Sequence, residues 1–140
     1  MGLKKNPTPP SLAGVALETL KKLKKEELLE RRKRNIEDGR CAVETRVGPI
    51  DFWTSRDAVT DLGHYVQEVT LAVIGGAMPQ DITRQWKSAS GIVLLPGDVA
   101  IQAGKLLADW TQEHFNHEAV LGAMVDAAET AEEVRAVEWT

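Results

Sequence analysis

The chain has 140 residues, enough for one domain with a hydrophobic core, and its single cysteine excludes an intramolecular disulfide bond. No apolar stretch approaches the ~18 residues that span a bilayer, and the start lacks the pattern of a signal peptide, so we expect a protein without membrane contact that is made in the cytoplasm. The net charge of -4 conceals a division: residues 1–40 hold 11 Lys and Arg against 6 Asp and Glu, which leaves 6 against 15 for residues 41–140. Such asymmetry is compatible with a nucleic-acid contact, with a contact to the acidic part of a second copy, or with a solvated helix of mixed charge.

The chain opens with residues 1–11, where three prolines predict an extended leader rather than a helix. Residues 12–39 predict a basic amphipathic docking helix, capped by Ser11 and ended by Gly39, because strong helix formers and oppositely charged i, i+4 pairs fill the segment. Its apolar positions suggest a narrow strip without a strict heptad, so we expect another protein to complete it. The predicted contact residues of this helix are Leu12, Leu17, Leu20, Leu23, Leu28 and Ile36.

Residues 40–140 predict a compact acidic domain made of two units on one plan, each a hairpin that leads into a helix. Apolar side chains alternate with polar ones over residues 42–54, which is typical of a hairpin with one buried face. Ser55 is suited to cap the helix that follows, and Gly75 to end it.

The second hairpin and helix repeat this order, and a short last helix follows them. Residues 82–95 predict the second hairpin, and Asp98 is the predicted cap of a long helix that runs to about Ala128. Thr130 and Glu133 fit a capping box, which indicates one more helix. The whole order predicts an α+β fold with a small antiparallel sheet covered by helices.

Tryptophan supplies most of the aromatic side chains, and one of the four is predicted to face outward. Trp53 follows Phe52 on a strand, and because neighbouring strand residues point to opposite faces, an inward Phe52 turns Trp53 outward. Exposed aromatic residues are typical anchors of protein interfaces, so Trp53 is a predicted partner contact. Cover by the neighbouring helix is the alternative.

Candidates for chemistry have stronger structural explanations. His114 and His117 share one helix face and form a possible start of a metal site, but a closed site needs about four ligands, so we predict polar residues at a helix edge instead. Asp57 and Asp98 occupy matching helix starts, where capping explains them better than acid–base catalysis. No nucleophile arrangement or phosphate-binding loop is present. We therefore predict no enzyme, no cofactor and no bound metal.

Several short features resemble a known family. They are Trp86-Lys87 followed by Gly91, a second hairpin that leads into a long helix, and the final segment of residues 126–139. Together they are similar to an uncharacterised domain of bacteriophage tail proteins, which often forms the C-terminal part of tail-fibre or tail-fibre-assembly polypeptides. The resemblance covers about residues 20–139 and carries no catalytic residues. It implies a place in a phage tail and a role in binding other proteins.

Three functions follow as hypotheses. The preferred one is a non-enzymatic structural or adaptor component of the tail fibre or baseplate region, located in the virion and bound to a fibre or baseplate protein or to a second copy. The first alternative is a tail-fibre assembly chaperone that is absent from the mature virion. The second is a nucleic-acid binder that uses the basic helix, which is disfavoured because glutamates interrupt residues 21–34 and no aromatic residue there can stack on a base.

Overall fold

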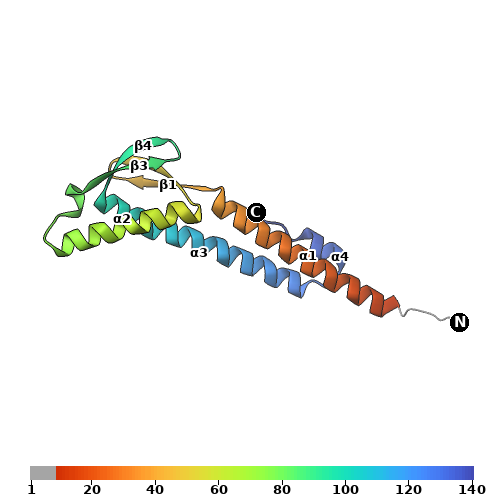
Figure 1. Cartoon of the computed structure of the whole chain (residues 1–140). Coiled ribbons are helices and arrows are strands. Elements are labelled where there is room, and N and C mark those ends of the chain that lie inside the picture. The colour runs from red at the N-terminus through yellow and green to blue at the C-terminus, as the bar shows by residue number, and fades with distance from the viewer. Residues whose placement is uncertain (1–8) are drawn as a thin grey trace. The chain divides into compact units, whose positions relative to one another are not determined.

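The computed structural model describes residues 9–140, apart from the side chains of residues 9–13 and 15. It confirms the predicted α+β class, with a long N-terminal helix followed by two hairpin-plus-helix units (Figure 1). The strands form two separate antiparallel pairs rather than one small sheet. The elements in chain order are α1 (Pro9–Glu37), β1 (Arg40–Thr45), β2 (Gly48–Trp53), α2 (Arg56–Ile74), the 3-10 helix η1 (Pro79–Asp81), β3 (Thr83–Ser88), β4 (Gly91–Pro96), α3 (Gly97–Ala127) and α4 (Ala131–Ala136).

The described chain forms two compact units. Unit 1 combines the chain up to Lys33 with Phe115–Thr140, and unit 2 comprises Arg34–His114. The sequence suggested a boundary at residue 39 instead, between a helix and a body of residues 40–140. The two divisions differ because the last part of α3 belongs with α1, a tertiary relation that no local pattern encodes.

Helix α1 differs slightly at both ends from its prediction. It begins at Pro9 rather than after Ser11, because the N–H groups of a first helical turn have no intrahelical acceptor and proline is tolerated there. The rest of the predicted leader, residues 1–8, lies outside the described residues. At the other end the helix stops at Glu37, two residues before Gly39, where a Cβ atom would clash with the carbonyl oxygen of Asn35, so this position admits only glycine without rearrangement.

The two hairpins have matching registers. β1 pairs with β2 from Arg40–Trp53 to Thr45–Gly48, and β3 pairs with β4 in the same way, ending at Ser88–Gly91. Each hairpin therefore closes through a two-residue turn. One backbone hydrogen bond joins the two hairpins, in which the Ala89 N–H donates to the carbonyl oxygen of Asp51 at 2.8 Å.

The core of unit 2 lies between the hairpins and two helices. Figure 1 shows α2 and the first part of α3 running along the hairpins on one side. Each hairpin turns one face inward, while α2 and α3 each contribute side chains spaced by three or four residues, as amphipathic elements do. The buried residues are Val43, Ile50, Phe52, Leu62, Tyr65, Val69, Leu95, Val99, Ala100, Ala103 and Leu107.

The predicted cap of α2 is confirmed, whereas that of α3 is wrong. The Ser55 side chain accepts a hydrogen bond from the Ala58 N–H at 3.3 Å. Helix α3 already begins at Gly97, so Asp98 lies in its first turn, where the guanidinium of Arg46 donates to both carboxylate oxygens at 2.7 and 2.9 Å. These bonds lower the pKa of the Asp98 carboxyl below its ordinary value.

Unit 1 has a smaller core, which Leu28 of α1 shares with α3 and the C-terminal segment. Leu28 is 2% exposed and packs with Leu121, Val125 and Val137, while Trp139 covers the cluster. The predicted capping box is confirmed at the start of α4. The Thr130 side chain accepts a hydrogen bond from the Glu133 N–H, and the Glu133 side chain accepts one from the Thr130 N–H. This cap fixes the turn that returns the C-terminal segment to the core.

Candidate functional site

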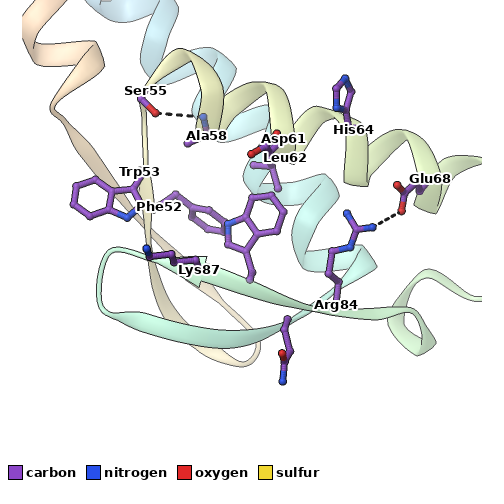
Figure 2. A pocket seen from close by; sticks show the side chains of 12 residues that line it. Phe52, Trp53, Ser55, Ala58, Asp61, Leu62, His64, Glu68, Arg84 and Lys87 are labelled. Carbon is purple, nitrogen blue, oxygen red and sulfur yellow. Dashed lines mark hydrogen bonds and ion pairs between the residues drawn. The ribbon is translucent and has the colours of Figure 1, made fainter.

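An open hollow of about 840 Å³ lies in unit 2 between α2 and the strands β2 and β3 (Figure 2). We call it the Trp53 hollow. Aromatic and charged side chains line it together, a combination that suits recognition of a polar partner with an apolar anchor. The lining residues are Phe52, Trp53, Ser55, Ala58, Asp61, Leu62, His64, Glu68, Arg84, Gln85, Trp86 and Lys87.

A stack of side chains forms the firm wall of the Trp53 hollow. The rings of Tyr65 and Trp86 are stacked with centroids 6.1 Å apart, and the Arg84 guanidinium lies 5.0 Å from the Tyr65 ring centroid. The Tyr65 hydroxyl donates to the carbonyl oxygen of Leu95 at 2.7 Å, and burial raises the pKa of this phenol. Glu68 on α2 then pairs with Arg84 at 2.9 Å, so strand β3 and helix α2 are tied together at this end (Figure 2).

Trp53 lies at the opposite end of the hollow, and much of its side chain is exposed to solvent. Its side chain is 41% exposed, whereas Phe52 beside it is 1% exposed in the core. Strand parity therefore predicts the orientation of Trp53 correctly. An exposed indole offers a large rigid surface and one N–H donor at little entropic cost, which suits an anchor for a partner.

Charged groups of both signs face the hollow without partners. Within residues 9–140, neither the Asp61 carboxylate on α2 nor the Lys87 amine on β3 has an ion pair or hydrogen bond. Figure 2 shows Lys87 on the strand side, near Trp53, and Asp61 on the helix side. Unpaired exposed charges cost little in water and become specific contacts when an opposite charge docks beside them.

The predicted contact residues of α1 do not form one strip. At about 100° per residue, Leu23 lies about 140° around the helix from Leu28. Leu23 is 55% exposed, whereas Leu28 is buried in the core of unit 1 and is not available to a partner, which corrects its assignment as a contact residue. Leu17, Leu20 and Ile36 are half-buried, and the side chain of Leu12 lies outside the described residues.

Several basic side chains of α1 bind groups in the C-terminal part of unit 1. Lys25 lies 2.5 Å from the Asp126 carboxylate and Arg32 lies 2.5 Å from that of Glu118. Lys21 donates to the backbone carbonyl oxygen of Asp126 at 3.0 Å. The positive charge predicted for a nucleic-acid contact is thus partly neutralised within the chain.

The two histidines of α3 each lie against a tryptophan. The Trp110 and His114 rings have centroids 4.0 Å apart, and His117 meets the Trp139 ring edge-on at 4.6 Å. Among residues 9–140, no three His, Cys, Asp or Glu side chains are grouped closely enough to hold a metal ion. Packing against the tryptophans accounts for the position of both imidazoles.

Sequence reasoning missed most of the Trp53 hollow. The stack of Tyr65, Trp86 and Arg84 depends on α2 lying across β3, and no local signal reports that contact. The sequence does predict that Arg84 and Trp86 share one face of β3, because alternate residues of a strand point to the same side. It does not show that this face meets a helix carrying Glu68 and Asp61.

The chain belongs to the family described as Domain of unknown function (DUF4376), whose model matches residues 19–138. No curated protein and no solved structure matches the chain. The matched range agrees closely with residues 20–139, the range over which the sequence resembles an uncharacterised domain, and the match itself names no function or setting. In the described part of the chain, no helix is both long enough and apolar enough to cross a membrane.

Proposed function

We propose that the chain is a non-enzymatic protein-binding component that receives its partner at the Trp53 hollow. The observation that carries the proposal is Trp53 itself, an indole 41% exposed at the mouth of an open hollow whose opposite wall is fixed by stacking and an ion pair. A fixed wall reduces the entropy lost on binding, and an exposed aromatic anchor supplies apolar contact area.

The proposed setting is the tail of a bacteriophage, where the chain is a structural or adaptor component that binds a tail-fibre or baseplate protein. This setting rests on the sequence resemblance alone. An assembly chaperone that leaves before maturation is the first alternative, and quantitative mass spectrometry of purified virions separates the two. A fixed stoichiometric amount of the chain supports the structural component, and its absence supports the chaperone.

Nucleic-acid binding through α1 is the weaker alternative. A phosphate contact would have to displace the acidic partners of Lys25 and Arg32, so part of the electrostatic gain would be lost. Helix α1 still offers the exposed side chain of Leu23 as a second contact to a neighbouring protein or to another copy.

Co-purification from infected cells tests the proposal. The tagged chain, the Trp53→Ala variant and the Leu23→Ala variant are recovered in parallel, and bound phage proteins are identified by mass spectrometry. We expect Trp53→Ala to lose the partner and Leu23→Ala to retain it. Retention by Trp53→Ala with loss by Leu23→Ala would move the contact to α1 and contradict the assignment to the hollow.

A further inference from the structure

The strand edge that faces the Trp53 hollow has main-chain groups without partners. In an antiparallel pair, hydrogen-bonded and non-hydrogen-bonded residue pairs alternate, and the pair that closes a two-residue turn is hydrogen-bonded. Counting back from the hydrogen-bonded pair Ser88–Gly91, the pairs Lys87–Ile92 and Gln85–Leu94 are non-hydrogen-bonded. The N–H and C=O groups of Gln85 and Lys87 therefore point away from β4, and both residues line the hollow.

The neighbouring strand β2 covers only one end of this edge. The single backbone hydrogen bond between the hairpins joins Ala89 to Asp51, at the turn of the second hairpin. β2 ends at Trp53, and the chain then turns into α2 at Arg56. No backbone hydrogen bond within residues 9–140 reaches the outward groups of Gln85 or Lys87. Beyond Trp53, the space between β3 and the start of α2 is the hollow itself.

We propose that an extended peptide segment of the partner protein occupies this position as an added strand on β3. The inference rests on the proposed function and names the chemistry of the partner. Main-chain hydrogen bonds to Gln85 and Lys87 provide affinity that is independent of sequence, as in other cases of strand addition. An unpaired strand edge is the surface that such a segment recognises.

The side chains of the hollow specify what the segment carries. An apolar side chain packs on the indole of Trp53 and against Trp86, both of which line the hollow. An acidic side chain pairs with Lys87 on the strand side, and a basic one with Asp61 on the helix side, because both charges are otherwise unpaired. The ligand is thus an apolar residue flanked by opposite charges in an extended segment. Arg84 and Glu68 already neutralise each other and close the far end.

Selection from a displayed library of random 12-residue peptides against the full chain provides the probes. We expect enriched peptides to contain an apolar residue between opposite charges and to lose binding in the Trp53→Ala variant. The decisive readout uses synthetic versions of the best peptide with a single backbone N-methyl group at each successive position. Methylation should weaken binding about tenfold at alternate positions and little at those between, because only alternate residues of an added strand face β3.

Paired proline variants test the same edge from the protein side. Gln85→Pro removes an N–H that points away from β4 at a residue lining the hollow. Thr83→Pro removes an equivalent N–H of β3 at a residue that does not line the hollow. We expect the first to weaken peptide binding and the second to leave it unchanged. If Gln85→Pro fails to fold, the N-methyl series still decides.

Two outcomes overturn the strand-addition proposal. One is that selected peptides bind at Trp53 but show no alternation in the N-methyl series, which leaves the proposed function standing. The other is that no peptide is enriched while a folded partner still co-purifies in a manner that depends on Trp53, which shows that the hollow receives a folded surface instead. If the wild-type chain recovers no partner, or if Trp53→Ala retains the partner, the proposed function itself is contradicted, so the two failures are distinguishable.

Discussion

At the scale of single residues, the pair of Arg46 and Asp98 links the first hairpin turn to the start of α3. The pKa of Asp98 is lowered in the folded chain by its hydrogen bonds to Arg46, so the pair stabilises the fold above the unfolded-state pKa, and this stabilisation is lost as the pH falls through the folded-state value. We expect Asp98→Asn to lower the urea midpoint at pH 7 and to reduce the loss of stability between pH 7 and pH 3.

Asp57 provides the matched control for that prediction. It lies in the first turn of α2, as Asp98 does in α3, but within residues 9–140 its side chain has no ion pair. Asp57→Asn should lower the urea midpoint at pH 7 by less than Asp98→Asn does, because no ion pair is lost. Equal losses in the two variants would show that helix position alone, and not Arg46, accounts for the effect.

Gly39 occupies a tight space within unit 2, between the last turn of α1 and Thr54, which follows β2. A Cβ atom there would also lie 2.9 Å from the Thr54 hydroxyl oxygen, so Gly39→Ala should cost about 1–3 kcal/mol of unfolding free energy. Gly63→Ala is the control, because its Cβ would meet nothing within 4 Å in the middle of α2. That change should raise stability by about 0.5–1 kcal/mol. Chemical denaturation measures both, and a stability of Gly39→Ala equal to wild type would refute the close approach.

At the scale of elements, the core of unit 1 depends on a single leucine of α1. Leu28→Ala should cost about 2–5 kcal/mol, because it opens a cavity among Leu121, Val125 and Val137. Leu23→Ala on the exposed side of the same helix should change stability by less than about 0.5 kcal/mol. Thermal unfolding of both variants is the measurement. Similar small effects would mean that α1 does not pack on its own chain.

Element boundaries set by local chemistry were predictable. The caps at Ser55 and Thr130 use hydrogen bonds that span only three residues, so short motifs encode them. The cap assigned to Asp98 failed because α3 begins one residue earlier, at Gly97, and the Asp98 carboxylate pairs instead with Arg46, which is 52 residues away in the sequence. The strip on α1 failed for a similar reason, since spacing did not reveal that Leu28 turns toward its own chain while Leu23 turns outward.

At the scale of the whole molecule, the sequence predicted the order of elements better than the site. Hydrophobic periodicity and capping residues encode helices and hairpins, which together define the α+β class. The Trp53 hollow instead requires α2 to lie across β3, so that Arg84, Trp86 and Glu68 meet. Only the outward turn of Trp53 was accessible from the sequence, because strand parity is a local property.

The most direct test of the account is a calorimetric titration of the co-purified partner into the wild-type chain and into the Trp53→Ala and Leu23→Ala variants. If the hollow receives the partner, Trp53→Ala should weaken binding by roughly 30-fold or more, as loss of a central aromatic anchor does, with Leu23→Ala within about twofold of wild type. An unchanged dissociation constant for Trp53→Ala, with the variant folded, would contradict the claim that this chain acts by binding a protein at the Trp53 hollow.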